Sequence, residues 1–113
     1  MKKAKLREKA ELLRILGHPV RLRILEELSK GTKCVSDIQD LLGVPQSNIS
    51  QHLLSLRRYQ LIDYTEDGVL RCYFIAKAEL VRDLFEFLKK DYPVARGTEV
   101  SHYKQRRAAG KNP

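Results

Sequence analysis

Residues 36–59, SDIQDLLGVPQSNISQHLLSLRRY, decide the fold of this chain because they encode two helices joined by a tight turn. Ser36 followed three residues later by Gln39 is the pattern of a capping box, which starts a helix. Gly43 is expected to end this short helix, since glycine readily adopts the left-handed conformation. Pro45 then suits the first turn of a second helix, where its missing N–H is not needed. The sequence therefore predicts a helix-turn-helix.

The second helix of this pair, predicted over residues 45–59, has one apolar side and one polar side. At 100° per residue, Ile49, Leu53 and Leu56 share one face, which we expect to be buried. The opposite side carries amides, hydroxyls and, at its end, arginines, where an ordinary surface helix shows Glu–Lys pairs. Such groups bind base edges and phosphates, although a plain polar surface helix is the alternative. The predicted DNA contacts of this helix are Gln46, Ser47, Ser50, Gln51, Arg57 and Arg58.

The flanking sequence places two helices before this pair and a β-hairpin and a helix after it. Asp67-Gly68 is a strong hairpin turn signal between two runs rich in β-branched and aromatic residues. The predicted elements are helices over residues 5–16, 19–29, 36–43, 45–59 and 77–92, and strands over 61–65 and 70–75. This order predicts a mainly α (α+β) winged helix-turn-helix. Arg71, just after the turn, is either a further DNA contact or a solvated strand arginine.

Composition and charge favour one folded domain with basic ends. The 113 residues are 42% hydrophobic and 32% charged, and we expect the domain to cover residues 1–93. The net charge of +8 is divided between residues 1–9 and 96–113, each carrying +4, while residues 10–95 sum to zero. Basic ends either contact phosphates or are solvated. Residues 94–113 lack an apolar period, so we expect a flexible tail.

The sequence argues against membrane, secreted and enzymatic classes. No apolar run reaches the ~18–20 residues of a membrane span, and the first residues lack the apolar core of a secretory signal. Two cysteines, Cys34 and Cys72, do not make a disulfide framework, so a cytoplasmic protein is expected. No phosphate-binding glycine loop, HExxH motif or convincing nucleophile–base pair is present, so no enzyme is expected. A winged-helix protein-interaction module remains the alternative to a DNA-binding regulator.

Four segments together resemble the arsenic-repressor-like (ArsR/SmtB) regulators. They are residues 16–25 (LGHPVRLRIL), 34–38 (CVSDI), 45–53 (PQSNISQHL) and 67–74 (DGVLRCYF), and the similarity covers about residues 6–90. The resemblance implies a repressor that binds a palindromic double-stranded DNA operator as a homodimer through its first and last helices. An inducer would then lower the affinity for DNA.

The apolar faces of the first and last helices favour a dimer independently of the resemblance. Leu12 and Ile15 widen the face of the first helix, and Leu80 and Phe87 widen that of the last. A monomer of this size has few places to bury such faces, and a two-fold dimer is the commonest solution.

The resemblance also implies two metal-sensing patterns, and both are incomplete here. Ser36 stands where a second thiol would follow Cys34, and serine is a poor ligand for thiophilic ions. The last helix has carboxylates but no histidine. Four roles stay open for Cys34 and Cys72. They are small buried residues without a sensing role, a thiol redox or persulfide switch, a metal or metalloid site completed by a partner protomer or another donor, or the site of another effector. The inducer stays unassigned.

Two further residues carry specific expectations. His52 lies beside the apolar face of its helix, where it either hydrogen-bonds within the domain or contacts a phosphate. Gln60 stands where the resembling family commonly has glycine, and a positive φ there would strain its backbone.

Overall fold

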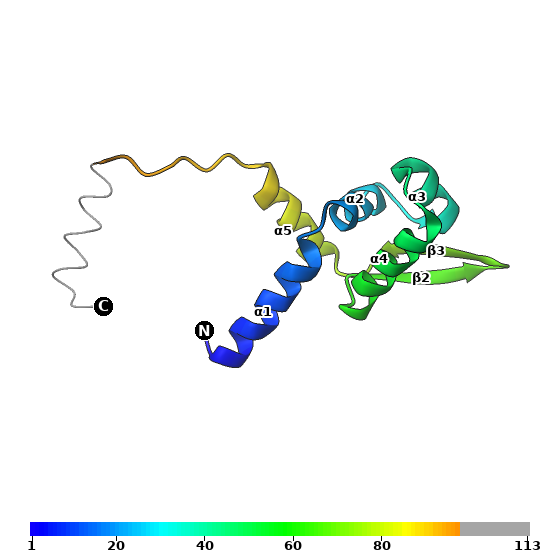
Figure 1. Cartoon of the computed structure of the whole chain (residues 1–113), viewed down its shortest axis with the longest axis horizontal. Helices are drawn as coiled ribbons and strands as arrows, with labels where there is room; N and C mark the ends of the chain where they lie inside the picture. The colour runs from blue at the N-terminus through cyan, green and yellow to red at the C-terminus, as the bar shows by residue number, and fades with distance from the viewer. Residues whose placement is uncertain (98–113) are drawn as a thin grey trace.

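The computed structural model describes residues 1–97 and has the predicted order of helices and hairpin (Figure 1). The elements are α1 (Lys3–Leu16), α2 (Pro19–Leu28), β1 (Lys33–Cys34), α3 (Val35–Leu42), α4 (Gln46–Arg58), β2 (Ile62–Asp67), β3 (Leu70–Ile75) and α5 (Ala78–Lys89). The winged helix-turn-helix is confirmed, with α3 and α4 as the helix pair and β2–β3 as the wing. Within residues 1–97, no helix has the length and apolarity to cross a bilayer. Most of the predicted tail, residues 98–113, lies outside the described residues.

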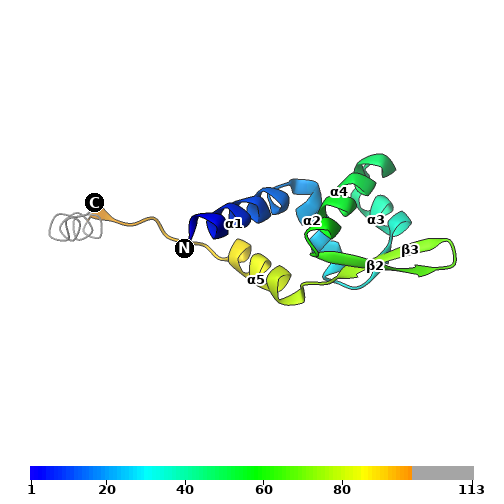
Figure 2. The same ribbon diagram turned by 90° about the horizontal axis from the view of Figure 1, so that it is seen from below.

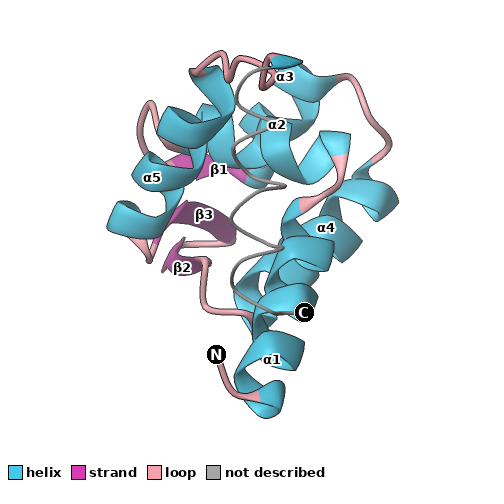
Figure 3. Cartoon of the chain, turned by 90° about the vertical axis from the view of Figure 1, so that its left-hand side faces the viewer, coloured by secondary structure: helices cyan, strands magenta, loops and turns pink. Residues whose placement is uncertain are grey.

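The wing is joined by a short strand that sequence patterns did not predict. β1 pairs antiparallel with β3, so the strand order is β1-β3-β2 (Figure 3). In the hairpin, Asp67 pairs with Leu70, which leaves Gly68 and Val69 as the central residues of the turn. Gly68 has a φ of +64°, as the first central residue of a two-residue type II′ turn requires.

The start of α3 differs from the prediction. Cys34, the last residue of β1, is the N-cap of α3, and its backbone N–H donates to the Asp37 carboxylate at 3.3 Å. The predicted cap at Ser36 with Gln39 is therefore wrong. Pairing with β3 keeps the chain extended as far as Cys34, and the helix begins at the next residue. Its end at Gly43, with a φ of +65°, is confirmed.

The core lies between the helices and the inner face of the wing. Ile49, Leu53 and Leu56 of α4 are each at most 1% exposed, which confirms the predicted buried face. They pack with buried residues from α1, α2, α3, the turn before β2, the wing and α5. These are Ile15, Leu16, Ile24, Leu25, Leu28, Ile38, Leu61, Ile62, Tyr73 and Val81.

Arg21 of α2 joins α4 to the rest of the domain. Its Nε donates to Nδ1 of His52 at 3.0 Å, and its Nη2 donates to Oγ of Ser55 at 3.3 Å. Its Nη1 donates to the carbonyl of Ile15 at 3.2 Å. The centroid of the His18 ring lies 4.4 Å from the centroid of the His52 ring. His52 thus takes the first of its two predicted roles, hydrogen bonding within the domain.

The first and last helices project to the end of the molecule opposite the wing tip (Figures 1 and 2). Leu13 of α1 is 65% exposed and Phe87 of α5 is 58% exposed. The predicted end of α5 near residue 92 is wrong, because the helix stops at Lys89. Beyond it the chain is extended, which lets the Tyr92 ring approach that of Phe87, with centroids 5.8 Å apart.

Candidate nucleic-acid interface

The second helix of the pair, α4, called the recognition helix below, presents its polar side to solvent along its whole length. Every predicted DNA contact of this helix is exposed: Gln46, Ser47, Ser50, Gln51, Arg57 and Arg58. The orientation follows from the buried aliphatic face, since side chains at i, i+4 and i+7 anchor one side and leave the other free. Leu54, 48% exposed, is the apolar member of this outer side.

A hollow of about 540 Å³ separates α4 from the wing and gathers four of the predicted contacts. It is lined by Val35, Ser36, Gln39, Gln46, Ser50, Leu53, Leu54, Arg57, Tyr64, Val69, Leu70, Arg71 and Tyr73. The lining contains two arginines and no carboxylate, so its charge is complementary to phosphate. Ser47 and Gln51 lie outside this hollow. Arg58 lines a separate, smaller hollow with Gln60 and Asp63.

Tyr64 organises the arginines of the hollow, a role that motif reasoning missed. The guanidinium carbon of Arg57 lies 4.4 Å from the centroid of the Tyr64 ring, and that of Arg71 lies 4.5 Å from it. Both distances are typical of cation–π contacts. The hairpin register contained a signal for this: Tyr64 faces Tyr73, so Arg71, two residues earlier on β3, is its diagonal neighbour.

Asp63 offsets part of the positive charge of Arg57. Arg57 Nε donates to Oδ1 of Asp63 at 3.0 Å, and both side chains are about half exposed. The backbone N–H of Tyr64 and the Arg57 guanidinium lower the pKa of Asp63, while the bond to Asp63 raises the pKa of Arg57. Both groups are therefore charged at neutral pH. Unlike Arg57, neither Arg58 nor Arg71 forms a salt bridge with a carboxylate of residues 1–97.

Cys34 and Cys72 are joined by a disulfide. The sequence did not predict this pairing; it arises because the β1–β3 register sets the two residues directly opposite each other across the sheet. In this form neither sulfur is a thiolate ligand. Among the described residues, no group of three His, Cys, Asp or Glu side chains is arranged to hold a metal ion. Residues 1–97 thus do not fit the metal-sensing patterns implied by the resemblance.

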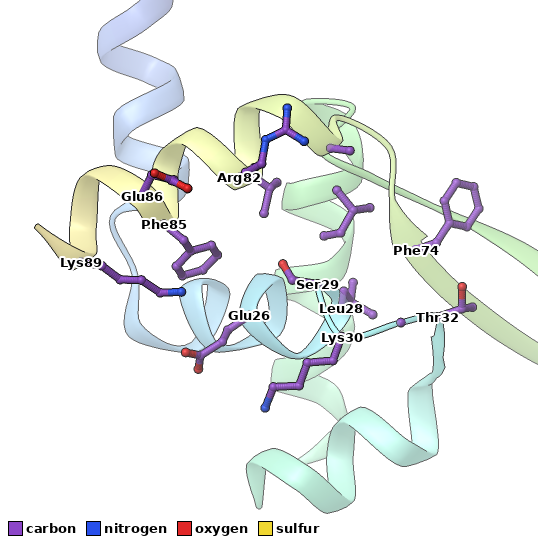
Figure 4. A pocket seen from close by; sticks show the side chains of 14 residues that line it. Glu26, Leu28, Ser29, Lys30, Thr32, Phe74, Arg82, Phe85, Glu86 and Lys89 are labelled. Atoms are coloured by element: carbon purple, nitrogen blue, oxygen red, sulfur yellow. The ribbon is translucent and has the colours of Figure 1, made fainter.

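Another hollow, of about 680 Å³, lies between α2, β3 and α5, away from the recognition helix (Figure 4). Leu28, Val81 and Phe85 contribute apolar surface. Its size falls in the range of small-molecule sites. Acids such as Glu26 and bases such as Lys89 both line it, so its charge does not select one class of ligand.

An exposed polar helix α4 beside a wing that presents Arg71 defines a winged helix-turn-helix of the DNA-binding type. Residues 18–64 match the family model described as "Bacterial regulatory protein, arsR family". The regulator CmtR of Mycobacterium bovis is 36% identical over 80 residues, which cover 71% of this chain and 68% of CmtR. The repressor PagR of Bacillus anthracis is 45% identical over 53 residues, 46% of this chain. The chain belongs to the ArsR family of regulatory proteins.

Solved structures agree with this assignment. Rv0081 of Mycobacterium tuberculosis aligns with a TM-score of 0.71 at 28% identity, over 95% of this chain and 99% of Rv0081. The homodimeric winged helix-turn-helix DNA-binding domain of Mb0332 from Mycobacterium bovis aligns with a TM-score of 0.68 at 28% identity, over 76% and 79% of the two chains. The 53 residues of this chain that align with the repressor PagR span about half of that protein, 54% of its length.

Proposed function

We propose that this protein is a sequence-specific DNA-binding repressor that acts as a homodimer in the cytoplasm, where its operator lies. The observation that carries the proposal is the exposed polar side of α4 together with the hollow between α4 and the wing, whose lining contains two arginines and no carboxylate. Family membership and relatives such as PagR, a transcriptional repressor, support it. The residue roles below are part of this proposal.

Ser47 and Gln51 are the proposed base-reading residues. They lie one helical turn apart on the outer side of α4, and both side chains are exposed to solvent. Gln reads adenine through two hydrogen bonds, and Ser bonds to several bases. Gln46 and Ser50 face the wing across the hollow. They are proposed to contact the edge of the DNA groove that Ser47 and Gln51 enter. Arg57, Arg58 and Arg71 are proposed to bind phosphates.

The direct test uses a duplex recovered by selection from a random library with the wild-type protein, compared with a scrambled duplex. Ser47→Ala and Gln51→Ala are expected to lower the preference for the selected duplex at least about fivefold. Arg58→Ala is expected to weaken binding to both duplexes equally. It should also reduce the slope of log affinity against log salt concentration by about one. Equal losses on both duplexes for all three variants would contradict base reading.

The protein-interaction alternative predicts a different salt response. Phosphate binding releases counterions, so affinity should fall steeply between about 50 and 200 mM salt. Undetectable binding of either duplex at about 50 mM salt would favour the interaction module instead. The acid-free lining of the hollow leads us to expect the steep dependence.

The homodimer is proposed to form through α1 and α5. Both helices leave apolar side chains exposed at the end opposite the wing, notably Leu6, Leu13, Phe87 and Leu88. The homodimeric state of the Mb0332 domain supports the same arrangement here. A two-fold axis at this end would place the two recognition helices on one side of a duplex, as half-site recognition requires.

A further inference from the structure

The Cys34–Cys72 disulfide connects the two parts of the proposed DNA-binding surface. Cys34 is the N-cap of α3, the first helix of the helix-turn-helix. Cys72 lies in β3, next to Arg71 of the wing. β1 contributes only two residue pairs, Lys33 with Tyr73 and Cys34 with Cys72. The disulfide is thus the covalent link that holds a very short strand, and with it the start of α3, on the wing.

The two sulfurs lie where small reagents can reach them. Side chains alternate between the faces of a strand, and Tyr73, beside Cys72, is 7% exposed and packs in the core. Cys72 therefore points to the opposite face of the sheet. Both cysteines are half-buried rather than buried. Their position is that of an accessible pair and not of two cysteines filling the core.

We propose that Cys34 and Cys72 are a reversible oxidation site and that the disulfide form binds DNA more tightly than the dithiol form. The inference rests on the proposed DNA-binding function and names the class of signal that would control it. A protein that works in the cytoplasm has few stable disulfides, and those that form there are mostly transient, catalytic or redox-sensing. The signal is then the balance between hydroperoxides and small thiols.

The chemistry balances with a hydroperoxide as the oxidant. One cysteine thiolate attacks the terminal peroxide oxygen; the S–O bond forms, the O–O bond breaks, and the alkoxide or hydroxide leaves and takes up a proton. The other thiolate attacks the resulting sulfenic sulfur; the S–S bond forms, and hydroxide leaves as water after protonation. Each peroxide gains two electrons and the pair of thiols loses two. Two equivalents of a small thiol reverse the step by exchange and end as its disulfide.

The direction of the effect follows from what the disulfide constrains. α3 packs on α4, and β3 carries the wing arginine, so the bond limits movement between the recognition helix and the wing. DNA must contact both at a fixed separation. A surface already ordered before binding loses less conformational freedom in the complex. Reduction leaves β1 held by two residue pairs alone, so the wing gains freedom and affinity falls.

The experiment uses the full chain oxidised with hydrogen peroxide, the same chain reduced with dithiothreitol, and the Cys34→Ser/Cys72→Ser variant under both treatments. Alkylation with iodoacetamide followed by mass spectrometry counts the free thiols in each sample. Fluorescence anisotropy gives the affinity for a duplex selected with the oxidised protein. We expect no alkylation of the oxidised chain, two alkyl groups on the reduced chain, and on the order of tenfold tighter binding by the oxidised form.

The serine variant should bind like the reduced chain after either treatment, which excludes damage by peroxide elsewhere. Equal affinities of the oxidised and reduced wild type, tighter binding by the reduced form, or two free thiols after peroxide would overturn the inference while leaving DNA binding intact. Absence of DNA binding in every sample at about 50 mM salt would instead overturn the proposed function, and the redox control with it. Because the main comparison uses unmutated protein, misfolding of a variant does not decide the result.

Discussion

Arg57 at the end of α4 lies over the ring of Tyr64 in β2, with its guanidinium carbon 4.4 Å from the ring centroid. Arg71 of β3 lies 4.5 Å from the same centroid. One aromatic ring thus positions a cation from the recognition helix and a cation from the wing. The separation of these two proposed phosphate contacts is set by a residue that need not touch DNA.

Replacing Tyr64 by leucine should therefore weaken DNA binding. An exposed cation–π contact contributes about 0.5–1 kcal/mol, so loss of two such contacts should lower affinity by about fivefold to thirtyfold. Tyr64→Phe keeps the ring and should bind within about twofold of wild type. Anisotropy titrations on the selected duplex make the comparison. Unchanged affinity of Tyr64→Leu would show that the arginines do not depend on the ring.

Removing the charge of Asp63 should strengthen DNA binding. Asp63→Asn retains an oxygen for the Tyr64 N–H but frees the full charge of Arg57 to interact with phosphate. We expect a gain of a few-fold at low salt and a salt slope steeper by about one. Asp83→Asn on the exposed surface of α5 is the matched control and should change little. A gain that persists unchanged at high salt would contradict the electrostatic explanation.

Acidification should destabilise the domain through His52. Burial, together with the charges of His18 and Arg21, lowers the pKa of His52 from its ordinary value of 6.5. The unfolded chain then takes up a proton more readily than the folded one. The contribution of neutral His52 to the free energy of unfolding is therefore fully present above pH 6.5 and is lost as the pH falls below it. Protonation of Nδ1 also ends its bond from Arg21.

The measurement is the thermal midpoint at pH 7.5 and pH 5.5 for wild type and His52→Gln, whose amide oxygen accepts from Arg21 without titrating. A hydrogen bond of about 1 kcal/mol corresponds to roughly 4–8 °C in Tm for a domain of this size. We expect the Tm of wild type to decrease more between pH 7.5 and pH 5.5 than the Tm of the variant. Equal losses would remove His52 as the cause.

Gln60 should be a site where glycine stabilises the protein. Its φ is +58°, in the left-handed region that favours glycine. A side chain in this left-handed region costs about 1–2 kcal/mol, part of which is offset by the greater freedom of glycine in the unfolded chain. Gln60→Gly should therefore raise the free energy of unfolding by about 0.5–1 kcal/mol. Gln51→Gly, inside α4, should lower it by about 1 kcal/mol in the same urea titration.

The proposed dimer should depend on α1 and α5 but not on the wing. Leu13→Glu and Phe87→Glu introduce charges at exposed apolar positions, so they should leave the helical circular-dichroism signal unchanged and yield monomers in analytical ultracentrifugation. Val69→Glu is the control, since Val69 at the wing tip is 99% exposed. A Leu13→Glu protein that sediments like wild type would place the interface elsewhere.

Local patterns in the sequence determined the helix-turn-helix, the wing and the outward face of α4. The spacing of Ile49, Leu53 and Leu56 defines a buried side, and the opposite side must then be exposed. Asp67-Gly68 marks the hairpin because few residues adopt a positive φ at low cost. These features depend on neighbours a few residues apart, which a sequence displays directly.

Only the tertiary structure decided the contacts that join distant segments. Cys34 meets Cys72 because a two-residue strand pairs in one register with β3, and two residues are too few to show a period. His52 receives a hydrogen bond from Arg21, 31 positions away, because α2 packs across α4. Such contacts follow from how whole elements pack, so the candidate DNA-reading residues were visible in the sequence but the link that constrains them was not.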